Sequence, residues 1–155
     1  MFERLFCEIY NCCMKNLNKT ARSYNMSQIR SKNTSPEMHV RRFLHSNGLR
    51  YSLHKKSLPG KPDIYLKKHN TAVFINGCFW HMHEGCPKFV MPKTRTDWWE
   101  RKLSRNRERD EQAIRDLKDM GYNVIVVWEC EINTIAKRDE RLPMLVQQIN
   151  SNLVK

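Results

Sequence analysis

At 155 residues the chain is long enough to form a domain with a hydrophobic core. Apolar residues make up 40% and charged residues 28% of the sequence, which excludes an intrinsically disordered protein. A formal net charge of +12 favours a polyanionic partner, and nucleic acid is preferred to an anionic membrane because no basic amphipathic helix with an aromatic face occurs.

The first part of the chain shows no clear helical or strand period. Residues 1–20 are interpreted as a leader, and the polar, basic residues 21–34 as an arm that contacts DNA. Residues 21–155 are then expected to form a single domain. The start of the chain lacks the features of a secretory signal, and no apolar run approaches the roughly 20 residues of a membrane helix, so a cytoplasmic protein is expected.

The predicted elements begin with a helix. Ser35-Pro36-Glu37 supplies an N-cap, a first helical position and an acidic first turn, and Gly48 ends the helical pattern. Extended segments are predicted at 51–53 and, after a Pro-Gly-Lys-Pro turn, at 63–66. Residues 71–75 are almost continuously apolar, as expected for a strand that is covered on both faces.

The second half of the chain predicts two helices around one strand. Thr96 is expected to cap a long helix that runs to about Met120, with Gly121 just beyond its end. Residues 123–128 predict a central strand, and residues 140–153 predict the last helix. This order of helices and strands favours an α/β sandwich with a central mixed sheet flanked by helices.

One face of the long helix is apolar at helical spacing, with two polar exceptions. The face consists of Trp99, Leu103, Asn106, Asp110, Ile114 and Leu117. Asn106 and Asp110 take positions where packing prefers apolar residues, so they are expected to face a site or to satisfy buried backbone groups. The basic residues beside this face either meet phosphates or form a solvated surface.

Cysteine and histidine residues cluster in the loop after the strand at 71–75. Cys78, His83 and Cys86, completed by Cys130, supply three thiolates and one imidazole, which is a closed set for a structural zinc ion. Such a site would tie the end of the last strand to this loop. The spacing allows His81 in place of His83, and Cys130 has the alternative of a buried apolar residue at a strand end.

Two further residues suit hydrolytic chemistry. Asp63 lies where a turn enters a strand and can hold Mg²⁺ through oxygen, although a surface aspartate is the alternative. The next strand ends at Asn76, without the second carboxylate that many magnesium-dependent nucleases carry there. His81 is the candidate general base, because histidine titrates near neutral pH; the alternatives are a zinc ligand and a packed histidine.

Aromatic residues in a basic protein can open a DNA duplex. Phe79 and Trp80 lie in the histidine-rich loop, and rings of this size can wedge between base pairs. Mismatched pairs cost least to open, so such a device favours lesions. The alternative is that the rings belong to the core, which is favoured for Trp98 and Trp99 taken individually.

Five blocks of sequence occur in a characteristic order. They are Pro-Gly-Lys-Pro-Asp63, Val-Phe-Ile-Asn-Gly-Cys-Phe-Trp-His81, Pro-Lys-Thr-Arg-Thr-Asp-Trp-Trp99, Asn106-Arg-Glu-Arg-Asp110 and Val-Val-Trp-Glu-Cys130, preceded by Arg22-Ser-Tyr-Asn-Met26 and Glu37. In this order they resemble the very short patch repair (Vsr) DNA mismatch endonucleases, over about residues 22–130. The resemblance implies a restriction-endonuclease-like α/β fold with a structural zinc site.

The resemblance also implies an activity. The protein would be a Mg²⁺-dependent endonuclease that nicks double-stranded DNA 5′ to the thymine of a T:G mismatch. Such mismatches arise when 5-methylcytosine deaminates within the target of a companion cytosine-5 methyltransferase. The enzyme would act as a monomer in the bacterial cytoplasm, at the nucleoid, and not at a membrane.

The resemblance implies catalytic roles for particular residues. Asp63 would coordinate Mg²⁺ together with the carbonyl oxygen of Ile75, and His81 would be the general base. Glu37 would approach the active site through ordered water. Some family members carry histidine at the position of Asn76, so a catalytic role here would be limited to hydrogen bonding.

Zinc and DNA contacts are implied in the same way. The zinc ligands would be Cys78, His83, Cys86 and Cys130. The rings that would insert beside the mismatch are those of Phe79, Trp80 and Trp99. Met26 would insert from the opposite groove. Further DNA contacts would come from Arg22 and Asn106. Two alternatives are a zinc-stabilised DNA-binding module without catalysis and a related nuclease that acts on another DNA structure.

Overall fold

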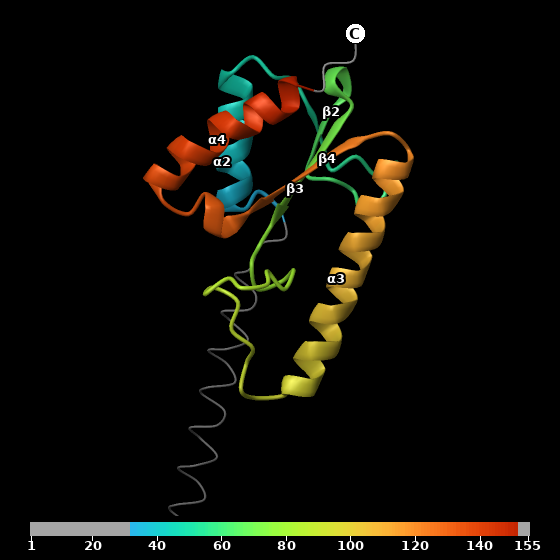
Figure 1. Ribbon diagram of the computed structural model, residues 1–155, viewed down its shortest axis with the longest axis vertical. Helices are drawn as coiled ribbons and strands as arrows, with labels where there is room; N and C mark the ends of the chain where they lie inside the picture. Colours follow the sequence, from blue (N-terminus) through green and yellow to red (C-terminus); the bar gives the residue numbers. More distant parts are fainter. Residues whose placement is uncertain (1–31, 152–155) are drawn as a thin grey trace, which may run out of the picture. The chain divides into compact units, whose positions relative to one another are not determined.

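A four-stranded mixed sheet forms the centre of the computed structural model, which describes residues 32–151 (Figure 1). Its strands lie in the order β1 (Ser52–Leu53), β2 (Ile64–Leu66), β3 (Thr71–Asn76) and β4 (Asn123–Trp128). The pairs β1–β2 and β2–β3 are antiparallel, whereas β3 and β4 are parallel. The predicted α/β architecture with a mixed sheet is confirmed.

The parallel pair decides where the loops of the two longest strands meet. Thr71 pairs with Asn123 at one end of the pair and Asn76 pairs with Trp128 at the other. Because parallel strands end at the same edge of a sheet, the segments that follow β3 and β4 leave side by side. Cys78 and Cys130, far apart in sequence, therefore enter the same region.

Helices cover both faces of the sheet (Figure 1). They are α2 (Ser35–Ser46), α3 (Thr96–Asp119) and α4 (Ile135–Asn150), with short 3-10 turns at Lys67–His69 and Glu129–Glu131. The helices α2 and α4 contact each other on one face, and α3 packs beside β4 on the other.

Alternating residues of the strands supply the two halves of the core. Val73 and Val127 face α2 and α4, where they pack with buried leucines such as Leu44 and Leu145. Ala72 faces the other way and packs with Leu117 of α3. Each fully buried leucine stabilises the fold by about 2 kcal/mol, so both helical layers are held by apolar burial.

Two helix starts differ from the prediction. The last helix begins at Ile135 rather than Glu140, because the Thr134 side chain caps it by accepting from the backbone N–H of Lys137 at 3.3 Å. The prediction that Thr96 caps the long helix is wrong. Thr96 is already the first helical residue, and its hydroxyl donates to the carbonyl of Pro92 at 3.1 Å.

Two helix ends can also be compared with the prediction. Gly121 follows α3 as predicted and has a φ of +81°, a conformation that glycine adopts without strain. The helix α4 ends at Asn150, and the predicted end at residue 153 lies outside the described residues.

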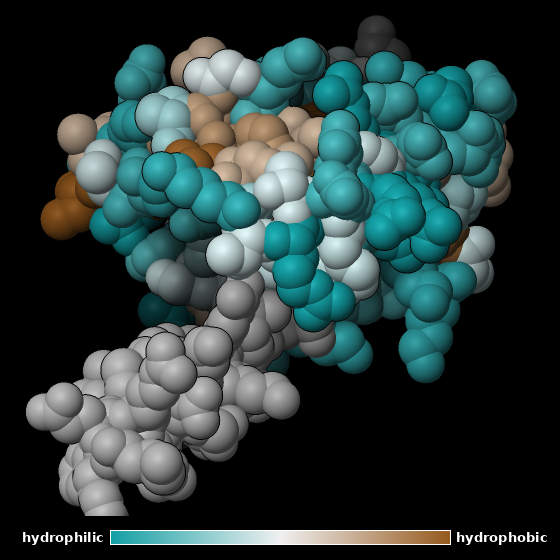
Figure 2. All heavy atoms as spheres, turned by 90° about the horizontal axis from the view of Figure 1, so that it is seen from below, coloured by the Kyte–Doolittle hydropathy of each residue, from teal (hydrophilic) through white to brown (hydrophobic). Residues whose placement is uncertain are grey.

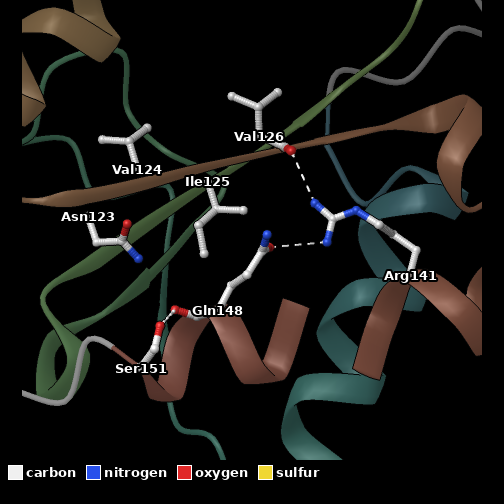
Figure 3. A pocket seen from close by; sticks show the side chains of 7 residues that line it. All are labelled: Asn123, Val124, Ile125, Val126, Arg141, Gln148 and Ser151. Atoms are coloured by element: carbon white, nitrogen blue, oxygen red, sulfur yellow. Dashed lines mark hydrogen bonds between the residues drawn. The ribbon is translucent and has the colours of Figure 1, made fainter. Parts of the chain in front are cut away.

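The prediction that residues 123–128 form a central strand is wrong, because β4 is an edge strand of the sheet, and its outer edge is closed by Arg141 of α4 (Figure 3). The guanidinium donates to the backbone carbonyl of Val126 at 3.4 Å, to Gln148 at 3.3 Å and to Glu131 at 3.3 Å. An open strand edge is a template for pairing with another chain. Arg141, whose side chain is only 14% exposed, occupies one of the edge carbonyls and holds α4 beside the strand.

The outer surface agrees with the composition of the chain. In the view of Figure 2 most of the surface is hydrophilic, with a smaller hydrophobic area among the hydrophilic side chains. Within residues 32–151 no helix is both long and apolar enough to cross a membrane. The predicted boundary between residues 20 and 21 lies outside the described residues.

Candidate active site and metal centre

Four metal-ligating side chains gather at the edge where β3 and β4 end. Cys78, His83 and Cys86 come from the loop after β3, and Cys130 comes from the 3-10 turn after β4. Their ligand atoms all lie within 4.8 Å of one another. Zinc with bonds of about 2.3 Å holds tetrahedral sulfur ligands about 3.8 Å apart, so a small contraction of the group suits that ion.

Two of the three thiols of this group, those of Cys78 and Cys130, are unfavourable as anions without a cation, whereas hydrogen bonds lower the pKa of Cys86. Burial raises the pKa of the Cys78 thiol to about 12. Burial also raises the pKa of Cys130. Such thiols stay protonated at neutral pH unless a metal ion replaces their protons, which is the chemistry of a thiolate metal site.

His83, and not His81, is the histidine that the loop brings to the cysteines. Its Nδ1 atom lies 3.4 Å from the sulfur of Cys130. The imidazole stacks on the ring of Trp128, with 3.9 Å between centroids and an interplanar angle of 3°. The backbone N–H of His83 donates to the carbonyl of Cys78 at 2.9 Å. Strand β4 therefore fixes both the ring and one of the cysteines.

A pair of carboxylates lies at the junction of α2 with the sheet. Glu37 is almost fully buried, and its Oε1 atom is 3.3 Å from the guanidinium of Arg41. Asp63, immediately before β2, accepts a hydrogen bond of 2.8 Å from the backbone N–H of Ile75 in β3. His54 reaches both acids, with 3.4 Å from Nε2 to Glu37 and 3.8 Å from Nδ1 to Asp63.

The Asp63 carboxyl lies in an environment that disfavours its charge. Burial raises its pKa, and the neighbouring Glu37 raises it further, while the hydrogen bond from Ile75 and the nearby His54 and His81 lower it. A partly buried carboxyl group with a raised pKa beside a second acid is typical of a site that receives a cation. The carboxylate oxygens of Asp63 and Glu37 suit a hard ion such as Mg²⁺.

His81 faces α3 instead of the cysteine group. Its Nδ1 atom is hydrogen-bonded to a carboxylate oxygen of Asp110. One turn earlier on the same helix, Asn106 donates from its side-chain amide to the backbone carbonyl of Trp80 at 3.2 Å. The two polar residues of the α3 face therefore hold the loop that carries His81. Asn76 is buried at the last position of β3.

The aromatic residues form one cluster beside this loop. Ring centroids are 5.2 Å apart for Phe79 and Trp80, 5.3 Å for Phe79 and Trp99, and 4.8 Å for Trp98 and Trp99. Trp99 is 7% exposed, whereas Trp98 is 39% exposed. The ammonium group of Lys102 lies 4.8 Å from the ring of Trp98. The exposed indole of the cluster thus belongs to Trp98.

A groove along α3 joins the aromatic cluster to basic side chains. It is lined by Trp98, Arg101, Lys102, Arg105, Asn106, Glu108 and Arg109. Cations beside an aromatic ring suit a nucleic acid, which presents phosphates and base faces together. Asn106, an expected DNA contact, lies in this groove, whereas Arg22 and Met26 lie outside the described residues.

Three residues of this region have contacts or exposure that the sequence did not predict. Asp110 was expected to face a site, but its pairing with His81 needs the packing of α3. Trp98 was interpreted as core but is exposed. Nothing in the sequence indicated that Trp99, and not Trp98, would be the buried one of the pair. His54 belongs to no recognisable sequence motif, and only the pairing of β1 with β2 brings it to Asp63.

Comparison with known proteins places the chain in a family. A family model for the DNA mismatch endonuclease Vsr matches residues 14–88. The type II nicking enzyme V.NmeAIP of Neisseria meningitidis is 48% identical over 83% of this chain and 91% of the relative. The type II nicking enzyme V.XorIIP of Xanthomonas oryzae is 45% identical over 81% of this chain and 92% of the relative. The DNA mismatch endonuclease Vsr of Escherichia coli is 39% identical over 74% of this chain and 72% of its own length. The chain is therefore a member of the Vsr family of DNA mismatch endonucleases.

Proposed function

We propose that this protein is a strand-specific endonuclease that nicks double-stranded DNA 5′ to the thymine of a T:G mismatch. The substrate follows from the family, whose Escherichia coli relative is named a DNA mismatch endonuclease. The mismatch would arise by deamination of 5-methylcytosine made by a companion cytosine-5 methyltransferase. The observation that carries the chemistry is that one imidazole, His81, is hydrogen-bonded to Asp110 and lies near the half-buried Asp63, which itself neighbours the buried Glu37.

The carboxylates provide the cation site of the proposal. Mg²⁺ would be held by Asp63 and the backbone carbonyl of Ile75, and by Glu37 through water. The backbone N–H of Ile75 already donates a hydrogen bond to Asp63. When bound there, Mg²⁺ would neutralise charge on the phosphate during hydrolysis. Asp63 is a partly buried carboxylate with a neighbouring acid and a raised pKa, and this supports the assignment.

His81 is the general base of the proposal. Because Asp110 accepts from Nδ1, the Nε2 atom of the neutral ring can take the proton of the attacking water. The water oxygen bonds to phosphorus, the bond from phosphorus to the 3′ oxygen breaks, and that oxygen takes up a proton. The products are a 3′-hydroxyl and a 5′-phosphate. Asn76 would contribute by hydrogen bonding only.

The aromatic cluster and the basic groove provide the DNA contacts. Phe79, Trp80 and Trp99 would open the stack beside the mismatch, and Met26 would enter from the other groove. Arg22 and Asn106 would contact the DNA from the arm and from α3. Trp99 is buried in the present arrangement, so the cluster must rearrange before this ring can enter the duplex.

The cysteine group would hold a structural zinc ion. Cys78, His83, Cys86 and Cys130 form a closed set without a position for water, so this ion would organise the loop and take no part in hydrolysis. The same loop carries His81, Phe79 and Trp80. Zinc binding would therefore be required for these side chains to take their places in the active site. A restriction-endonuclease-like domain of residues 21–155, acting as a monomer at the nucleoid, completes the proposal.

A strand-resolved nicking assay tests the proposal. Labelled duplexes with one T:G mismatch in several sequence contexts are compared with T:A and C:G duplexes, each with Mg²⁺ and with EDTA. A Mg²⁺-dependent nick on the 5′ side of the mismatched thymine is expected, and Asp63→Ala should bind the mismatch without nicking it. Binding without any nick in all contexts would favour a non-catalytic DNA-binding module, and nicking of another structure would favour a related nuclease.

A further inference from the structure

His54 is a histidine beside the proposed cation site that has no place in the chemistry described so far. Its ring lies between the buried Glu37 and the half-buried Asp63, with Nε2 3.4 Å from Glu37 and Nδ1 3.8 Å from Asp63. The side chain is 27% exposed, so the ring is partly open to solvent. Glu37 comes from α2 and Asp63 from the start of β2, and His54 is the side chain that contacts both.

The backbone of His54 is set by the same aspartate that its side chain reaches. Leu53 pairs with Ile64 at the end of the antiparallel β1–β2 ladder. This pairing brings His54, which follows Leu53, to Asp63, which precedes Ile64. The N–H of His54 then donates to the backbone carbonyl of Asp63 at 3.2 Å. Residue 54 is thereby tied to Asp63 through main chain and side chain together.

His54 also has an unusual backbone conformation. Its φ is +46°, in the left-handed region that few residues other than glycine adopt, although asparagine, aspartate and histidine are enriched there. Such a conformation persists only where the surrounding structure imposes it, and it gathers at functional sites.

We propose that His54 is a positioning residue that holds the Glu37 and Asp63 carboxylates in the arrangement that receives the divalent cation. The inference rests on the proposed role of Asp63. Partners of ligating carboxylates orient the ligands, and their loss lowers metal affinity by about 10- to 100-fold. Glu37 is already held by Arg41 and Asp63 by Ile75, and His54 fixes the position of the two acids relative to each other.

The test compares two side chains that tolerate this backbone with one that keeps a polar group. His54→Asn and His54→Gly suit a positive φ and remove the ring, whereas His54→Gln keeps a polar group of longer reach. His45→Asn is the matched control, because His45 is an exposed histidine at the end of α2. All variants are prepared as the full chain with their zinc.

The first readout is Mg²⁺ binding followed by NMR at the backbone amide of Ile75, which donates to Asp63. The second is the Mg²⁺ concentration that gives half of the maximal nicking rate on a T:G duplex. His54→Asn and His54→Gly should raise both half-saturation values about 10-fold or more, with His54→Gln between them and the wild type. Binding of the T:G duplex in EDTA should stay unchanged.

The outcomes separate this inference from the function on which it rests. Wild-type half-saturation values for both His54→Asn and His54→Gly overturn the positioning role, even if Asp63→Ala abolishes nicking. Equal effects of His45→Asn would also overturn it. If Asp63→Ala leaves nicking and the Ile75 response to Mg²⁺ intact, the proposed cation site itself is wrong.

Discussion

The Nδ1 atom of His81 and the carboxylate of Asp110 are joined by a hydrogen bond that links the loop after β3 to the middle of α3. The two residues are separated by 29 positions in the chain, and no local pattern connects them. In this pair the carboxylate fixes both the orientation of the ring and the nitrogen that carries the proton. The same helix presents the basic groove, so DNA contact and base orientation depend on one element.

Asp110→Asn should lower the single-turnover nicking rate by about 100-fold or more, because an amide can also donate to Nδ1 and favour the wrong tautomer of His81. Mismatch binding should remain, since Asp110 is not among the residues that line the groove. Asp119→Asn, an exposed acid at the end of the same helix, is the control. A variant that nicks at the wild-type rate would show that Asp110 does not orient the base.

Asp63→Asn should raise the free energy of unfolding of the protein without Mg²⁺ by about 1 kcal/mol at neutral pH, as substitutions that relieve a strained active site commonly do. The Asp63 pKa is raised in the folded protein by burial, so the folded state binds this proton more tightly than the unfolded state. Stability from Asp63 is therefore present below its ordinary pKa of 3.8 and is lost as pH rises through the raised value.

Denaturant unfolding with EDTA checks this sign. EDTA must leave the zinc in place for the comparison, which metal analysis of the treated protein verifies. The difference between variant and wild type should be small in acid and should grow toward neutral pH. A difference that is constant with pH would mean that the ionised Asp63 is not the source of the instability.

Cys130→Ser should remove the bound zinc and lower the free energy of unfolding by at least about 3 kcal/mol, because the metal holds the loop and the end of β4 together. Metal analysis should find one zinc ion per wild-type chain, and reloading the metal-free protein should release protons, since burial keeps Cys78 protonated without a cation. Cys7→Ser is the control, because Cys7 is not among the predicted zinc ligands. Zinc retention by Cys130→Ser would exclude Cys130 as a ligand.

Trp98→Ala and Trp99→Ala should have different effects although the residues are neighbours. Trp99 is buried among Phe79, Trp80 and Trp98, so its truncation should cost about 3 kcal/mol of folding stability. Trp98 is exposed in the groove, so its truncation should weaken DNA binding by about 10-fold with little change in stability. Thermal unfolding and a binding titration with a T:G duplex measure both. Equal stability losses would show that both rings belong to the core.

Local patterns in the sequence predicted the elements well where a strong signal marked them. The apolar runs of β3 and β4 and the glycine after α3 each depend on neighbouring residues only, so the sequence is enough to predict them. The start of α4 was predicted too late, although Thr134 is an N-cap residue that the sequence displays. Thr96 has the right type for a cap but bonds backward to Pro92, a choice set by the loop before it.

The sequence by itself determined the fold class, the set of metal-ligating residue types and, through five ordered blocks, the family. These conclusions depend only on which residues occur and in what order, and both can be read from the sequence. The spacing left His81 and His83 open for the cysteine group, the resemblance implied His83, and the tertiary structure brings His83 to the cysteines. Only the tertiary structure paired His81 with Asp110, buried Trp99 instead of Trp98, and placed His54 between Glu37 and Asp63. Each of these depends on contacts between segments far apart in sequence, and such contacts are set by strand pairing and helix packing, which leave no local pattern to read.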